Sequence, residues 1–180
     1  MITFEKIRWK NFLSTGNSFT EIEFNRSPST LVVGENGSGK STMLDAVCFS
    51  LFNKPFRKIS KSQLINSINN KKMVVEIEFR IGQKEFKVIR GVKPSIFEVY
   101  CDGQMLDQDA AVRDTQKYLE DSVLKMNFKS FTQIVILGSA SFTPFMQLPT
   151  ASRREIIEDI LDIEIFTTMN QVLREKISSL

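Results

Sequence analysis

Histidine is absent from this 180-residue sequence, and cysteine, tyrosine and tryptophan are scarce, with two, two and one copies. Without histidine, the commonest general base and metal ligand is excluded from any chemistry proposed for the chain. The two cysteines, Cys48 and Cys101, lie far apart in apolar surroundings. They indicate reduced thiols, so we expect a cytoplasmic protein without a disulfide framework.

Long apolar runs are also missing. No stretch approaches the roughly 18 residues that a membrane-spanning helix needs, and the first residues lack the basic-then-apolar order of a signal peptide. We therefore expect no membrane partner. The net charge of +3 permits a nucleic-acid partner but does not indicate one. A hydrophobic content of 42% is typical of a globular protein with a single core.

The strongest motif lies in residues 31–44, LVVGENGSGKSTML. Gly34–Ser41 fit the pattern G-x-x-x-x-G-K-[ST] of a phosphate-binding loop. We expect a buried strand at Leu31–Val33 before the loop and a helix from about Gly39 to Phe52 after it. Glycines let successive N–H groups turn towards a polyphosphate, and the helix N-terminus adds partial positive charge. The sequence therefore predicts a binding site for a nucleoside triphosphate.

Residue types divide the roles within this loop. The Lys40 ammonium would reach the β and γ phosphates, which makes Lys40 the catalytic candidate, and the Ser41 hydroxyl would bind Mg²⁺. The remaining residues would hold the phosphates through the backbone or act beside them: Gly34, Glu35, Asn36, Gly37, Ser38, Gly39 and Thr42.

The rest of the sequence reads as an α/β protein. Alternating apolar residues predict strands at 3–12, 18–24, 73–80, 84–90 and 96–100. Helical spacing predicts helices over 109–124 and from about Ala151, the second with a break near 162–165. Residues 133–137 are an apolar run that we expect to form a buried strand.

Residues 54–72 are strongly basic and contain no acid. Such a run is either a solvated loop beside an active site or a surface that contacts nucleic-acid phosphates. Its cations are Lys54, Arg57, Lys58, Lys61, Lys71 and Lys72.

A catalytic acid at the end of a second buried strand is missing. Nucleotide hydrolases of this class need one to hold Mg²⁺ or to orient water. The candidate strand at 133–137 is followed by Gly138, and Glu76 and Glu78 alternate with apolar residues as on the solvent face of a hairpin. This absence argues against a self-sufficient nucleotide kinase.

Three segments together resemble one family. They are Ile7–Phe12, the loop Gly34–Ser41 with Leu44-Asp45-Ala46 after it, and Arg153 leading into Glu155–Leu161. They are similar to the N-terminal half of the ATPase heads of SMC-like DNA repair proteins in the ABC ATPase superfamily, in particular to the ATPase subunits of phage recombination endonucleases.

The resemblance implies a P-loop NTPase of ABC type. Residues 1–165 would form the N-terminal lobe of a head, with a mixed sheet and an antiparallel β meander, and residues 166–180 would begin a coiled-coil arm. The catalytic acid would come from a second lobe of the same head. Two heads would dimerise on ATP and Mg²⁺, bind double-stranded DNA and control a metal-dependent nuclease subunit. The expected location is the host cytoplasm if the gene belongs to a phage.

The resemblance also implies further site residues. Ser14 would lie beside the adenine, next to Leu13 where many relatives carry Arg, and Asn66 and Ser67 would touch the nucleoside from the other side. The family's Q-loop Gln-Gly appears here as Leu137-Gly138, so either Gln133 reaches the metal through a shifted loop or this head lacks that ligand. DNA contacts fall on Lys54, Arg57, Lys58 and Lys61. The chain alone is expected to show no turnover. The alternatives are a chromosome-organising SMC-type ATPase without a nuclease and a P-loop nucleotide kinase.

Overall fold

The computed structural model describes residues 2–106, 112–136, 143–161 and 163–178. The chain divides into two compact units, Met1–Gln116 and Lys117–Leu180, which are taken separately below. The expected boundary between a lobe ending at 165 and an arm starting at 166 remains a prediction.

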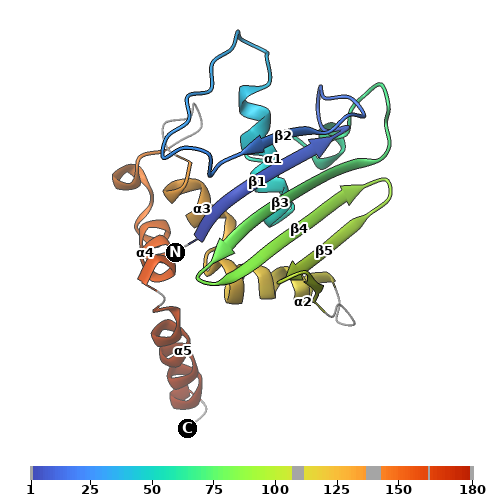
Figure 1. Ribbon diagram of the computed structural model, residues 1–180. Coiled ribbons are helices and arrows are strands. Elements are labelled where there is room, and N and C mark those ends of the chain that lie inside the picture. Colours follow the sequence, from blue (N-terminus) through green and yellow to red (C-terminus); the bar gives the residue numbers. More distant parts are fainter. Residues whose placement is uncertain (1, 107–111, 137–142, 162, 179–180) are drawn as a thin grey trace. The chain divides into compact units, whose positions relative to one another are not determined.

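The first unit is built on a six-stranded sheet in the order β2-β1-β3-β4-β5-β6 (Figure 1). Every pairing between these strands is antiparallel. The meander expected at 73–100 is confirmed, and the two N-terminal strands are confirmed with shorter bounds. The strands are β1 (Ile2–Lys10), β2 (Thr20–Glu23), β3 (Met73–Ile81), β4 (Lys84–Val92), β5 (Ile96–Cys101) and β6 (Gln104–Met105).

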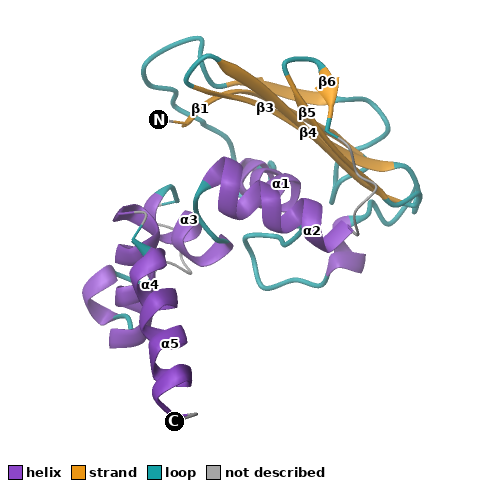
Figure 2. Cartoon of the chain, turned by 90° about the horizontal axis from the view of Figure 1, so that it is seen from below, coloured by secondary structure: helices purple, strands orange, loops and turns teal. Residues whose placement is uncertain are grey.

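One face of this sheet carries the core. Ile7, Ile77 and Val88 lie on neighbouring strands in paired positions and have no exposed surface. Helix α1 (Lys40–Phe52) packs on this face, as Figure 2 shows from below the view of Figure 1. Phe49 and Leu51 of α1 are fully buried there, and each such side chain contributes roughly 1.5–3 kcal/mol. The strand period of two therefore separates a core face from a polar face.

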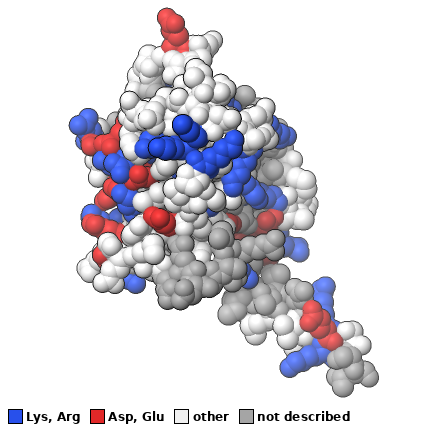
Figure 3. Space-filling model, turned by 90° about the vertical axis from the view of Figure 1, so that its right-hand side faces the viewer, with Lys and Arg blue, Asp and Glu red and all other residues white. Residues whose placement is uncertain are grey.

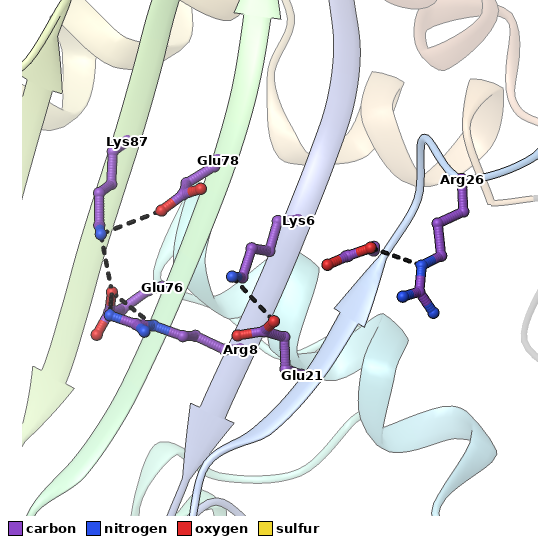
Figure 4. Close-up of polar contacts among 8 residues, drawn as sticks. Lys6, Arg8, Glu21, Arg26, Glu76, Glu78 and Lys87 are labelled. Atoms are coloured by element: carbon purple, nitrogen blue, oxygen red, sulfur yellow. Dashed lines mark hydrogen bonds and ion pairs between the residues drawn. The ribbon is translucent and has the colours of Figure 1, made fainter.

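The polar face holds a network of ion pairs rather than a solvated row of charges (Figure 4). Glu76 is only 7% exposed, and its Oε2 atom accepts hydrogen bonds from Arg8 at 3.0 and 2.7 Å. Lys87 lies 3.2 Å from Glu76 and 3.1 Å from Glu78. The expectation of a solvent face is therefore wrong for Glu76, because cations on both neighbouring strands cover its carboxylate.

Helix α1 begins and ends at residues with left-handed backbone. Gly39 precedes it at φ 96° and Asn53 follows it at φ 58°, donating its N–H to Phe49 O. Both ends agree with the predicted helix. Beyond the last turn, Arg90 Nε donates to Ser50 O at 3.0 Å, and Gln116 Nε2 donates to Leu51 O at 3.0 Å. Side chains from outside the helix thus satisfy carbonyls that its last turn leaves open.

The buried strand expected at Leu31–Val33 is wrong. These residues carry no regular structure, and the side chains of Leu31 and Val33 are 86% and 80% exposed. The sheet edge nearest in sequence, β2, pairs only with β1, so no described strand lies beside residues 31–33. A three-residue apolar segment cannot form a strand without a neighbour to bond to.

The second unit is helical in its described parts. It contains the end of α2 (Val112–Lys117), the π-helical η2 (Tyr118–Leu124), α3 (Phe128–Ile134), the 3-10 turn η3 (Phe145–Gln147), α4 (Thr150–Leu161) and α5 (Glu164–Ser178). The expected helix over 109–124 is confirmed from residue 112 onward, and the final helix is confirmed with its interruption. The strand expected at 133–137 is wrong: residues up to Ile134 belong to α3, and Leu137 lies outside the described residues.

The error at 133–137 has its cause outside the apolar run itself. Asn127 caps α3, because its side-chain oxygen accepts hydrogen bonds from the N–H groups of Lys129 and Ser130. On the following turn, Ser130 Oγ donates to Asp159 of α4, and Lys129 Nζ lies 2.6 Å from Glu155. The cap and the contacts with α4 set the helix, although its apolar residues alone also suit a strand.

Two kinds of feature are absent from the described residues. No helix there is both long and apolar enough to cross a membrane. No group of three or more Cys, Asp or Glu side chains there is arranged to hold a metal ion.

Candidate functional site

The phosphate loop, residues 34–41, leads directly into α1 (Figure 1). Gly37 has φ 88° and Gly39 has φ 96°, conformations that side chains with a Cβ rarely adopt. At Gly34 the need is steric, because a Cβ there would lie 2.5 Å from Ser38 Oγ. Backbone conformation therefore favours glycine at 37 and 39, and a Cβ at 34 would require the Ser38 side chain to shift.

Lys40 is held across this loop. Its Nζ atom donates hydrogen bonds to Gly34 O at 2.5 Å and to Glu35 O at 2.7 Å. The ammonium thus lies beside the start of the loop. The N-terminus of α1, where Lys40 stands, also carries partial positive charge. The ammonium and the helix N-terminus together favour a polyanion as ligand.

A cleft of about 530 Å³ opens beside the loop. It brings together three segments far apart in sequence: residues 13–14, the phosphate loop with the start of α1, and residues 57–67. Its lining residues are Leu13, Ser14, Asn36, Gly37, Gly39, Lys40, Ser41, Thr42, Arg57, Gln63, Ile65 and Ser67. Ser14 and Ser67, which the sequence assigned to opposite sides of a nucleoside, therefore do share one cleft with the phosphate-binding residues.

Not every candidate lines the cleft. Gly34, Glu35 and Ser38 belong to the loop without lining it, and Asn66 is buried behind it with 5% of its surface exposed. Arg57 and Gln63 line it although the sequence did not place them there. The signal for Arg57 was present in Asp45, an acid on the apolar side of α1 that needs a cationic partner.

Arg57 is anchored by that acid. Asp45 has no exposed surface, and its Oδ1 accepts from the Arg57 N–H at 2.9 Å while its Oδ2 accepts from Arg57 Nε at 2.6 Å. The Arg57 side chain itself remains 45% exposed. The contact ties the basic loop to α1, and Arg57 also lines the cleft.

The other cations of the basic run divide into different settings. Lys54 and Lys58 are exposed, and Lys61 lies 5.9 Å from the Phe49 ring centre. Burial, followed by the charge of Arg90, lowers the pKa of the Lys61 ammonium. Their assignment to DNA, like the roles of the cleft residues, remains a prediction.

The two metal candidates have different settings. Ser41 lies in the cleft. Gln133 lies in α3, and its Oε1 atom is buried without a hydrogen-bond partner among the described residues. Its expected strand is wrong, so its metal role stays a prediction that needs a different route to the metal. Gly138, the other half of the altered Q-loop, lies outside the described residues.

The cleft has the donor set that a magnesium nucleotide requires. Left-handed glycines orient backbone N–H groups, an ammonium and a guanidinium supply positive charge, and a helix-start hydroxyl can bind Mg²⁺. No carboxylate lines this cleft, so its described lining holds no general base.

Comparisons with known proteins agree with this geometry. A family model described as "AAA domain" matches residues 6–179. The chain is 42% identical over 175 residues to "Exonuclease subunit 2" of Escherichia phage RB69, covering 97% of this chain and 31% of that protein. It is 29% identical over 182 residues to the "DNA double-strand break repair Rad50 ATPase" of Thermoplasma acidophilum, covering 98% of this chain and 20% of that protein.

Solved structures share the fold. The Smc head domain of Pyrococcus furiosus, determined with an extended coiled coil, superposes with a TM-score of 0.62 at 24% identity, covering 99% of this chain and 46% of that chain. The chain spans about a third or less of the curated relatives named above. The expected P-loop ATPase class and head-type fold are therefore confirmed.

Proposed function

Since the chain belongs to the AAA-domain family of P-loop ATPases, we propose that it is the N-terminal lobe of an ATPase head that controls a DNA-processing nuclease. The observation that carries the proposal is the single cleft in which the phosphate loop meets residues 13–14 and 63–67. The similarity to an Smc head domain supports the head, and the phage relative named as an exonuclease subunit supports the nuclease.

Within the cleft, this chain's residues bind and orient ATP. Backbone N–H groups of residues 36–42 hold the phosphates, the Lys40 ammonium balances charge on the β and γ phosphates, and Ser41 binds Mg²⁺. Leu13 and Ile65 offer apolar contact to the base, and the Arg57 guanidinium adds positive charge. When bound, Mg²⁺ would neutralise phosphate charge as water attacks.

Hydrolysis requires groups from elsewhere, because no carboxylate lines the cleft. The second lobe of the head would supply the catalytic acid and a strand to cover Leu31–Val33. A second copy of the head would close over the nucleotide. The exposed apolar side chains of α5, among them Phe166, Leu173 and Ile177, support a coiled-coil arm that pairs with a returning helix.

The test is ATP binding and turnover measured separately. This chain should bind Mg²⁺-ATP, and Lys40→Met should weaken binding at least tenfold by removing the ammonium. Turnover should be negligible for the chain alone and appear in the full-length protein. Steady-state hydrolysis by the chain alone would contradict a split site. Phosphoryl transfer to a small acceptor would instead favour the kinase.

DNA binding is proposed for a lysine cluster at one end of the sheet, defined as Lys10, Lys71, Lys72 and Lys93. Lys10 ends β1, and the Lys72 N–H donates to Lys93 O at 2.7 Å. This end lies at the right of Figure 1, and basic side chains gather on the corresponding side of the molecule (Figure 3). Clustered lysines bind phosphodiesters independently of sequence.

Charge reversal separates this cluster from the basic loop. Lys71→Glu with Lys72→Glu should weaken binding of double-stranded DNA by the full-length protein and flatten its salt dependence. Lys54→Glu with Lys58→Glu is the matched control, because it reverses two charges at exposed positions of the basic run. A larger loss in the control than in the Lys71/Lys72 variant would assign the DNA surface to the loop at 54–61 instead.

A nuclease partner is proposed from the phage relative's name. The alternative, a chromosome-organising ATPase, shares the head fold and lacks that partner. Purification of the full-length protein with its associated subunits decides between them. A co-purifying metal-dependent nuclease is expected, and its absence would favour the alternative.

A further inference from the structure

Two loops meet at one end of the cleft. Residues 11–17 contribute Leu13 and Ser14 to its lining, and residues 64–72 contribute Ile65 and Ser67. The loops touch through their backbones, because Leu13 N–H donates to Leu64 O at 2.6 Å and Asn66 N–H donates to Asn11 O at 2.9 Å. A cluster of asparagine side chains adds further bonds between the loops.

Asn11 is the centre of that cluster. Its side chain is 1% exposed, and its backbone is left-handed at φ 51°. Its Nδ2 donates to Asn17 Oδ1 at 3.0 Å and to Lys72 O at 3.1 Å, while its Oδ1 accepts from Asn69 Nδ2 at 2.7 Å. Both amide donors and the acceptor are thus used, two of the three bonds reaching the other loop.

Asn66 completes the connection from the opposite side. Its Nδ2 donates to Leu13 O at 3.0 Å, and its Oδ1 accepts from the N–H groups of Ile68 and Asn69 at 3.0 and 2.9 Å. Like Asn11, it does not line the cleft. A buried polar network in which these groups are satisfied fixes a local geometry.

We propose that Asn11, Asn66 and Asn69 are positioning residues. They hold the loops 11–17 and 64–72 at the separation that the nucleoside part of a bound nucleotide requires. This inference rests on the proposed nucleotide binding. The phosphate end of the cleft is built from residues 34–42, none of which bonds to the asparagine cluster. The cluster therefore acts on affinity for a whole nucleotide and not on affinity for a bare triphosphate.

The decisive variant is Asn66→Asp, which keeps an oxygen for the Ile68 and Asn69 N–H groups and loses the donor to Leu13 O. Asn70→Asp is the matched control: it adds the same charge to the same loop, and the side chain of Asn70 bonds to Lys93 Nζ at 2.9 Å instead of to residues 11–17. Calorimetry on the full-length protein would compare Mg²⁺-ATP with Mg²⁺-tripolyphosphate.

Asn66→Asp should weaken ATP binding at least tenfold and change tripolyphosphate binding less than about twofold. One buried hydrogen bond is lost, and a carboxylate oxygen replaces the donor 3.0 Å from Leu13 O. Asn70→Asp should change neither. Asn69→Ala removes only the donor to Asn11 Oδ1, and it decides the question if Asn66→Asp does not fold, as judged from thermal melting of Trp9 fluorescence. It should weaken ATP binding severalfold with tripolyphosphate unchanged.

Each other outcome overturns the inference. Equal losses for both ligands would mean a general folding role, and unchanged ATP affinity would mean that the loops need no positioning. If the unaltered protein binds tripolyphosphate but gains nothing from the nucleoside, the inference fails while phosphate binding stands. If it binds neither ligand, the proposed function fails as well.

Discussion

At the scale of single residues, the site depends on contacts that leave almost no room for substitution. Gly34 lies against Ser38, Lys40 spans the loop, and the buried Asp45 holds Arg57 beside the cleft. Gly34 and Lys40 contribute little to the core, so changes at these two positions should affect ligand binding more than folding. Replacing Arg57 would also leave the buried Asp45 carboxylate without its cation and so destabilise the fold.

Gly34→Ala tests this distinction. Its Cβ would lie 2.5 Å from Ser38 Oγ and 3.3 Å from Ser38 Cβ, so the Ser38 side chain must shift within the loop. About 1.4 kcal/mol of strain from this shift would correspond to a tenfold loss of ATP affinity. Gly16→Ala is the control, because nothing lies within 4 Å of a Cβ there. Calorimetric ATP titration and urea unfolding of both variants are the measurements. An unchanged affinity for Gly34→Ala would show that the loop adapts without cost.

Cys48 gives a pH dependence of stability. Burial, with a smaller effect of the Asp45 charge, raises the pKa of its thiol from 9.0 to about 12. The stabilisation is complete below pH 9 and is lost as the pH rises towards 12, because the unfolded thiol ionises first. Urea unfolding followed by Trp9 fluorescence should show this decline. Cys48→Ala should flatten it more than Cys101→Ala, and identical slopes in the two variants would argue against it.

At the scale of elements, α1 is the part on which the site depends. Its N-terminus carries the phosphate loop, and its C-terminal carbonyls accept hydrogen bonds from Arg90 and Gln116. Arg90 is 3% exposed and its guanidinium lies 3.8 Å from the Phe97 ring centre. The meander thus fixes the helix at the end opposite to the ligand.

Arg90→Met should destabilise the chain by about 2 kcal/mol, because Ser50 O loses a donor with a charge and Gln116 loses a partner. Arg80→Met is the control, since the ion pairs of Arg80 are partly exposed and worth at most about 1 kcal/mol. Urea denaturation measures both. A loss for Arg90→Met no larger than for Arg80→Met would contradict the capping role.

At the scale of the whole molecule, the cleft has no carboxylate in its lining, and the apolar segment Leu31–Val33 is exposed and joins none of the described strands. A second lobe that supplies a catalytic acid and a neighbouring strand would explain both features. Pairing of a second-lobe strand with Leu31–Val33 should be detectable without any measurement of catalysis.

Hydrogen exchange at residues 31–33 tests whether a strand of the second lobe pairs with them. In this chain their amides should exchange quickly, because residues 31–33 belong to no strand. In the full-length protein they should become protected, whereas the amides of Ile77 in β3 should be protected in both. Rapid exchange at 31–33 in the full-length protein would remove the second-lobe strand from the proposal.

Local patterns in the sequence predicted much of this protein. The phosphate loop, α1 with its end at Asn53, the meander of β3 to β5 and the interrupted final helix all follow from spacing and turn residues. Such signals involve residues close in the chain, where backbone conformation is decided locally.

Only the tertiary structure decided the remainder. Leu31–Val33 have the composition of a strand, but a strand requires a neighbour that the described chain does not provide. The apolar run at 133–137 fits a strand or a helix, and the contacts of α3 with α4 favour the helix that includes Gln133 and Ile134. The hydrogen-bond partners of Arg57, Glu76 and Asn66 lie 12, 68 and 53 residues away in the sequence. Local sequence patterns cannot predict such partners, because only folding brings these residues together.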